Sequence, residues 1–183
     1  MAKIYTKTGD SGMTFVGGGM RVSKSCLPVA CYGAIDELNA HIGLLNDYVK
    51  TIPIETVLLK IQNALFTIGA TLASGERKNS KSSIPNLNEE DVVLLENEID
   101  KMSAILPPVK HFILPGGHVF VSQAHVARTV CRRAECLCVA LFDKKNEATI
   151  LPIMKYLNRL SDYLFVLARF LSFQLNVQET AWK

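Results

Sequence analysis

The feature that most constrains the fold of this chain is a set of apolar stripes with helical spacing, the longest of which lies near the C-terminus. Between residues 151 and 176, apolar side chains recur every three or four positions, at Ile153, Leu157, Leu160, Leu164, Leu167, Leu171 and Leu175. This spacing predicts one continuous helix, and its near-heptad pattern is typical of antiparallel helix packing. A strand would need alternation with a period of two, and no segment sustains it.

Four more segments carry the same signal. Helices are predicted over residues 29–50 and 54–73, from Asn88 to just before Pro107, and over 119–142. Their apolar stripes are Ile35, Leu38, Ile42, Leu45 and Val49; Ile54, Leu58, Ile61, Leu65, Ile68 and Leu72; Val92, Leu95, Ile99 and Met102; and Val126, Val130, Ala134, Leu137 and Leu141. Asn88 precedes three acidic residues, which is the pattern of a capped helix start. The sequence therefore predicts an all-α, five-helix bundle with ferritin-like up-down packing.

The chain has 183 residues, a length that suits one domain. We divide it into an irregular N-terminal arm over residues 1–25 and a helical bundle over 26–178. Residues 75–88, rich in Ser, Asn and Lys, are predicted to form a solvated loop, and HFILPGGH an extended piece with a tight glycine turn.

Composition and charge exclude several classes. The net charge of +3 is too small to indicate nucleic-acid binding, and no apolar run approaches membrane-spanning length. The chain has 5 cysteines without paired CxxC motifs, so a structural zinc site is not expected. Its histidines have no metal-ligand spacing, and we assign no metal ligands. With no signal or transit pattern at the start, we expect a cytoplasmic protein.

The arm contains TKTGDSGMTFVGGGMRVSK, a segment rich in glycines, hydroxyl side chains and cations. Glycine lets backbone N–H groups approach an anion, hydroxyls donate to phosphate oxygens, and lysines neutralise charge. The segment is not a Walker loop, because it lacks GxxxxGK[ST]. A flexible Gly/Ser-rich leader would look similar, and both interpretations stay open at this point.

The predicted fourth helix places Arg128, Arg132 and Glu135 at i, i+4 and i+7, with Arg133 adjacent. Such arginines can bind phosphate oxygens bidentately. A solvated basic face is the alternative. Asp36 is either an acid favoured near the start of its helix or a partner for an arginine of the fourth helix. The cysteines of the fourth helix, Cys131, Cys136 and Cys138, are interpreted as buried packing residues.

Three blocks of sequence, in order, lead to a family. IYTKTGDSGMTFVGGGMRVSK with VACYGAIDELNAHIGLL, then FILPGG and AHVARTVCRRAE, then YLNRLSDYLFVLAR closely resemble the PduO-type ATP:cob(I)alamin adenosyltransferases. The blocks cover roughly half of the chain. Two departures from the family pattern are Cys136, where an arginine is common, and Met20, where an acid is common.

The resemblance implies a homotrimer with ATP, Mg²⁺ and cobalamin bound between subunits. By similarity, the nucleotide-binding residues are Thr6, Lys7, Thr8, Gly9, Asp10, Thr14, Lys24, Arg132, Arg133, Glu135 and Asn158. Arg128 would pair with Asp36 of the adjacent subunit, and Phe112 would lie under the corrin ring. Together with Arg132, these three form the predicted catalytic set.

The implied reaction transfers the 5′-deoxyadenosyl group of ATP to the cobalt of cob(I)alamin and releases triphosphate. Because the nucleophile belongs to the corrinoid, the protein needs none of its own. A reductase and an adenosylcobalamin-dependent enzyme are further expected partners. Two alternatives are another ATP-dependent phosphotransferase and a non-catalytic adenosylcobalamin carrier.

Overall fold

The fold was analysed in a computed structural model, which describes residues 3–17, 19–50, 52–74, 84–142 and 147–183. Within these ranges the helices are α1 (Leu27–Tyr48), α2 (Glu55–Ser74), α3 (Glu89–Ser103), α4 (Val119–Leu141) and α5 (Glu147–Gln174). The predicted all-α, five-helix fold is confirmed. α1 packs against α2 and α4, α4 against α5, and α5 against α3. Most of the predicted loop, residues 75–83, lies outside the described residues.

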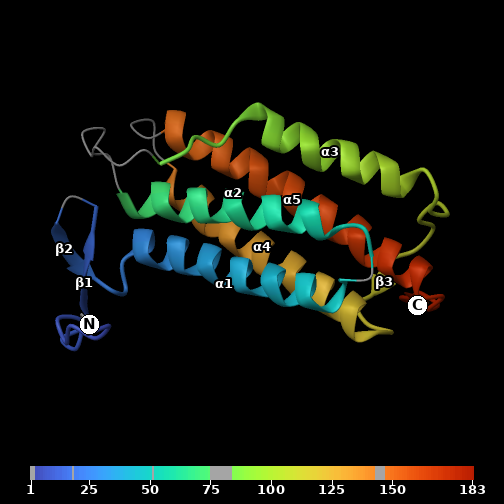
Figure 1. Ribbon diagram of the computed structural model, residues 1–183, viewed down its shortest axis with the longest axis horizontal. Coiled ribbons are helices and arrows are strands. Elements are labelled where there is room, and N and C mark those ends of the chain that lie inside the picture. Colours follow the sequence, from blue (N-terminus) through green and yellow to red (C-terminus); the bar gives the residue numbers. More distant parts are fainter. Residues whose placement is uncertain (1–2, 18, 51, 75–83, 143–146) are drawn as a thin grey trace.

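The helices alternate in direction along one long axis (Figure 1). The N-terminal arm lies at the end where α1 begins, and the C-terminus lies at the opposite end, beside the loop that precedes α4. The two ends of the bundle therefore carry different segments, which matters for how a site can be assembled.

The core forms where the predicted stripes meet. Every stripe residue of α1 and α2 is buried, as are those of α5 except Leu175, which is half-buried. α3 begins as predicted, because the Asn88 N–H donates to Asp91 Oδ2 at 2.8 Å. α5 begins at Glu147, a few residues before the predicted start, and Pro152 lies within it.

The stripe predicted for α4 is partly wrong. Val126 is 41% exposed, and Leu137 and Leu141 are only half-buried. The buried face of α4 consists instead of Val121, Ala124, His125, Ala127, Val130, Cys131, Ala134 and Cys138. Because α4 packs against both α1 and α5, small residues on this face allow the close approach of two neighbouring helices.

Two of the α4 cysteines are packing residues, as predicted. Cys138 Sγ lies 3.0 Å from Cys31 Sγ of α1, and Cys131 Sγ donates to the Leu157 carbonyl of α5 at 3.2 Å. Burial raises the pKa of the Cys131 thiol, which keeps it protonated. Cys136 is exposed, so its assignment as a buried residue was wrong.

The arm is more regular than predicted. β1 (Met13–Val16) and β2 (Met20–Ser23) form an antiparallel hairpin in which Thr14 lies opposite Val22. A second short pair joins β3 (Ile113–Leu114), inside the predicted extended piece, to β4 (Thr180–Ala181) near the C-terminus. Strands this short show too little alternation to be recognised in the sequence.

α2 also departs from the sequence analysis, because by length and composition it could cross a membrane, with a mean hydropathy of 1.3. Its apolar residues Leu58, Ile61 and Leu65 are fully buried in the bundle core. Packing against α1 covers this face, whereas Leu59 and Phe66 on other faces of α2 are exposed.

Candidate active site

The first part of the arm folds into a tight turn. Lys7 has a left-handed backbone with φ of 59°, and the Asp10 N–H donates to the Lys7 carbonyl at 3.3 Å. The Gly12 N–H donates to the Gly9 carbonyl at 3.2 Å. The hydroxyls of Thr6 and Thr8 are 2.8 Å apart. The predicted residues from Thr6 to Asp10 therefore lie in one compact loop.

Two cations of β2 and its C-terminal end fold back over this loop. The Lys24 N–H donates to the Gly12 carbonyl at 2.9 Å, and Lys24 Nζ lies 2.9 Å from where a Cβ on Gly9 would stand. Arg21 Nη2 donates to Ser11 Oγ at 2.9 Å and to the Thr8 carbonyl at 3.3 Å. The loop thus combines hydroxyl side chains with the positive charge of Lys24 and Arg21, a combination that suits phosphate. Arg21 was not among the predicted site residues.

The hairpin is held against the bundle at Gly17. Its N–H donates to the Ala73 carbonyl at the C-terminal end of α2 at 2.7 Å. A Cβ at Gly17 would stand 1.9 Å from the Ser74 carbonyl oxygen, so no side chain fits. This contact satisfies a carbonyl at the end of a helix and fixes where the arm leaves the bundle.

A second group of polar residues lies where α1, α4 and α5 meet. Arg133 of α4 forms an ion pair with Glu37 of α1, and Asn158 Nδ2 of α5 donates to Glu135 Oε1 of α4 at 3.1 Å. Arg132 is exposed, and no carboxylate of the described residues pairs with it. The structure thus joins Arg133 to α1 and Glu135 to Asn158 of α5, and leaves Arg132 without a carboxylate partner among the described residues.

Arg128 lies one turn before Arg132 and contacts a buried histidine. Arg128 Nε donates to His125 Nδ1 at 3.4 Å, and the His125 ring lies 6.4 Å from the Phe165 ring of α5. Burial, and to a smaller extent the charge of Arg128, lower the pKa of His125 to about 4. Burial and the adjacent Arg132 lower the pKa of Arg128. His125 is therefore neutral at pH 7 and can accept the hydrogen bond that orients Arg128.

Asp36 is exposed in the third turn of α1, and no described residue of its own chain forms an ion pair with it. The alternative that it merely favours the helix start is therefore wrong, because the macrodipole acts within the first turn. Within one chain, the structure does not bring Asp36 and Arg128 together as an ion pair.

Phe112 lies far from the arm. Its side chain is 79% exposed, just before β3 at the C-terminal end of α1 (Figure 1). The arm lies at the other end of the bundle. Since α1 has 22 residues, these ends are separated by about 33 Å.

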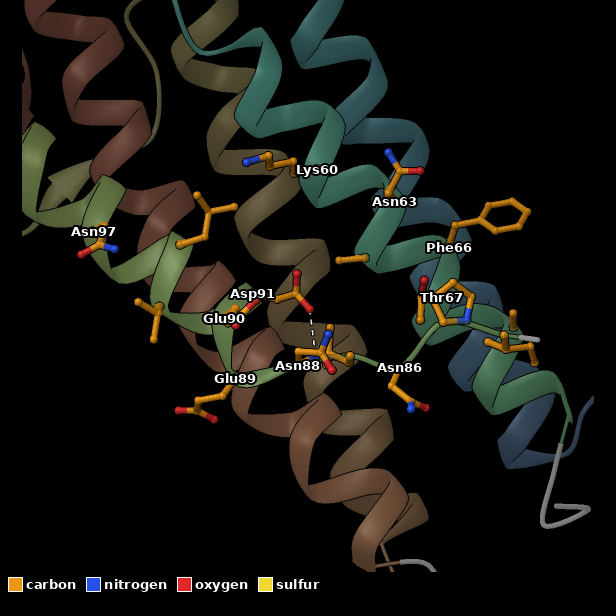
Figure 2. Close-up of a pocket in the computed structure, with 17 residues that line it drawn as sticks. Lys60, Asn63, Phe66, Thr67, Asn86, Asn88, Glu89, Glu90, Asp91 and Asn97 are labelled. Atoms are coloured by element: carbon orange, nitrogen blue, oxygen red, sulfur yellow. Dashed lines mark hydrogen bonds between the residues drawn. The ribbon is translucent and has the colours of Figure 1, made fainter.

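A cleft of about 990 Å³ opens between α2 and the start of α3 (Figure 2). Asn63 and Phe66 border it on α2, and Asn88 and Asp91 on the α3 side. None of the predicted site residues lines this cleft, so size alone does not identify the active site.

Known proteins match this chain over most of its length. The family model described as "Cobalamin adenosyltransferase" matches residues 4–171. The corrinoid adenosyltransferase of Bacillus subtilis (strain 168) is 47% identical over 172 residues, which cover 91% of this chain and 85% of the relative. The cobalamin adenosyltransferase of Cupriavidus metallidurans is 41% identical over 189 residues, covering 100% of this chain and 95% of the relative.

A solved structure extends this likeness to the fold. A variant of the PduO-type ATP:corrinoid adenosyltransferase from Lactobacillus reuteri, complexed with cobalamin and ATP, has a TM-score of 0.89 and 36% sequence identity. The match covers 99% of both chains. Together, the family match and these identities show that the chain belongs to the cobalamin adenosyltransferase family.

Proposed function

We propose that this chain adenosylates cob(I)alamin at a site completed by a second copy of itself, within a homotrimer. The chain is an ATP-dependent corrinoid adenosyltransferase by family. The reaction joins the 5′ carbon of ATP to cobalt, breaks the bond from that carbon to the α-phosphate oxygen, and releases triphosphate. The observation that carries the proposal is the exposed Arg132, which has no carboxylate partner in the described chain although the adjacent Arg133 has one.

The separation between the arm and Phe112 supports a shared site. ATP is too short to extend along the whole of α1, so the arm and Phe112 of one chain cannot act on the same ATP and corrinoid. Asp36, which has no ion-pair partner among the described residues of its own chain, would then meet Arg128, which is oriented by His125, across the subunit boundary. A closed threefold assembly repeats this contact identically at each boundary.

The nucleotide-binding residues act by position and charge. Lys7, Lys24 and Arg132 meet the negative charge that develops on the leaving triphosphate. The turn from Thr6 to Asp10, with Thr14 on β1, supplies hydroxyl donors for phosphate oxygens, whereas the Asp10 N–H already donates within the turn. Glu135, Asn158 and Arg133 hold the nucleoside end, since they are already fixed by contacts among α1, α4 and α5.

Mg²⁺ fits this site as an ion carried by the triphosphate. The described residues contain no group of three His, Cys, Asp or Glu side chains that could cage a metal, whereas Mg²⁺ usually takes one or two carboxylates together with phosphates and water. Asp10, in the arm loop, is the carboxylate that would contribute. When bound, the ion neutralises phosphate charge.

Phe112 prepares the corrinoid. An exposed aromatic side chain against the lower face of the ring would exclude water or the nucleotide base from the cobalt. Without that axial ligand, cobalt(II) is more easily reduced to the nucleophilic cobalt(I). A reductase supplies the electron, an adenosylcobalamin-dependent enzyme receives the product, and we place these steps in the cytoplasm.

The test is a turnover assay that follows the cobalamin spectrum with ATP and a chemical reductant. Formation of adenosylcobalamin with one triphosphate per turnover supports the proposal, whereas ADP as product would indicate a phosphotransferase. Binding of adenosylcobalamin without turnover would indicate a carrier. Analytical ultracentrifugation must give the mass of a trimer; a fully active monomer would contradict the shared site.

A further inference from the structure

The C-terminal segment returns to the loop that carries Phe112. β3 and β4 pair antiparallel, with Ile113 opposite Ala181, and the Trp182 N–H donates to the Phe112 carbonyl at 2.8 Å. The Phe112 and Trp182 rings meet edge to face, with centroids 6.2 Å apart. Since the Phe112 side chain is otherwise exposed, its position depends on this strand pair.

Arg169 ties both sides of the strand pair to α5. Its Nε donates to Glu179 Oε1 at 3.0 Å, just before β4, and its Nη2 donates to the Pro107 carbonyl at 2.8 Å, five residues before Phe112. Arg169 is 8% exposed. A buried guanidinium is stable only when paired, and its planar fork fixes the direction of both bonds, which a lysine cannot do.

The turn between α5 and β4 reinforces this arrangement. Asn176 has a left-handed backbone with φ of 53°, and the Val177 N–H donates to the Ser172 carbonyl at 2.8 Å, as in a Schellman helix end. The Val177 side chain lies close to Gly117: a Cβ built on Gly117 would stand 2.9 Å from Val177 Cγ1. The chain is thereby directed back along the Phe112 loop.

We propose that Arg169 is a positioning residue for cobalt(II) reduction: through Glu179 and Pro107 it holds Phe112 where the corrinoid must lie. This inference rests on the proposed role of Phe112. Arg169 itself does not touch ATP or cobalt, so its loss should impair the reduction step while leaving adenosyl transfer from preformed cobalt(I) largely intact.

The experiment compares Arg169→Met, Arg169→Lys and Glu179→Gln with the control Arg159→Met. Arg159 is also an α5 arginine, and its ion pairs among the described residues are with Glu96 of α3 and Asp162 of α5 rather than with the C-terminal segment. Each full-length variant is assayed with ATP, once from cob(II)alamin plus reductant and once from prereduced cob(I)alamin. Electron paramagnetic resonance of bound cob(II)alamin reports whether an axial ligand remains.

We expect Arg169→Met to lower the cobalt(II) rate at least about tenfold, the factor lost with a charge-assisted hydrogen bond, and to retain the axial-ligand signal. The cobalt(I) rate should change less than about threefold, and Arg169→Lys should restore part of the loss. Arg159→Met should match the wild type in both assays.

Equal losses in both assays, or a wild-type resonance spectrum, would overturn the inference. If Arg169→Met does not fold, Glu179→Gln tests the inference instead, because it keeps Arg169 in place and weakens only the bond between these two side chains. The inference then requires Glu179→Gln to lower the cobalt(II) rate more than the cobalt(I) rate. Phe112→Ala distinguishes the proposed role of Phe112 from the proposed role of Arg169. If the cobalt(II) rate falls selectively with Phe112→Ala but not with the Arg169 and Glu179 variants, only the inference about Arg169 is refuted. Full activity of Phe112→Ala from cobalt(II) refutes both.

Discussion

Replacing Gly17 with alanine tests whether the arm must be held against the end of α2. The new Cβ would lie 1.9 Å from the Ser74 carbonyl oxygen, whereas ordinary contact begins at 3.4 Å. Because the opposing atom is backbone, the hairpin must move by about 1.5 Å and lose the 2.7 Å bond to Ala73. A displacement of this size at a substrate-positioning element costs about 10²-fold in rate.

We therefore expect Gly17→Ala to lower kcat/KM for ATP by about 10- to 100-fold in the cobalt(I) assay. The bundle core is untouched, and losing one hydrogen bond of about 1 kcal/mol should lower Tm by only about 2–4 °C. The matched control is Gly69→Ala in α2, where the Cβ would meet Ile35 Cγ2 at an ordinary 3.7 Å. Wild-type kcat/KM in Gly17→Ala, or an equal loss in Gly69→Ala, would refute the reasoning.

Three further perturbations address α1 and α4. Arg132→Ala should lose about 10²–10³ in kcat with trimer and Tm retained, and normal turnover would contradict its role. Asp36→Ala or Arg128→Ala should weaken assembly and activity together, measured by size-exclusion chromatography and kinetics; loss of activity in an intact trimer would count against the pairing. His125 has a pKa near 4 when folded and near 6.5 when unfolded, so the unfolded state binds more protons between these values. The free energy of unfolding should therefore fall by about 3 kcal/mol as the pH drops from 6.5 to 4. In urea unfolding measured across this pH range, His125→Gln should lack this part of the pH dependence.

The helices with large apolar residues could be predicted from the sequence. Leu and Ile at helical spacing mark the buried faces of α1, α2 and α5, because these faces pack against one or two neighbours with large side chains. The same reasoning predicts the buried face of α4 only in part. This face consists of Ala and Cys residues with Val121, Val130 and His125, so large apolar side chains do not mark it, and Val126 lies outside the core.

The site was predictable in its residue types but not in its geometry. The arm composition indicates an anion, yet the placement of Lys24 over Gly9 follows from the turn of the β1–β2 hairpin. The docking of Gly17 on Ala73 and the bond from Arg169 to Glu179 join segments with no shared sequence pattern. Such contacts are set by how the helices pack.

The central claim, that one active site uses the arm of one chain and α4 of another, is tested most directly by mixing two inactive variants. Lys24→Ala removes an arm cation and Arg132→Ala the α4 cation, and each homotrimer should have little activity alone. After unfolding together and reassembly in equal amounts, about one quarter of the sites should combine an intact arm with an intact α4, and activity should return to about that fraction of wild type. A mixture that assembles into trimers and stays inactive would contradict the claim, because it would mean that each chain holds its own complete site.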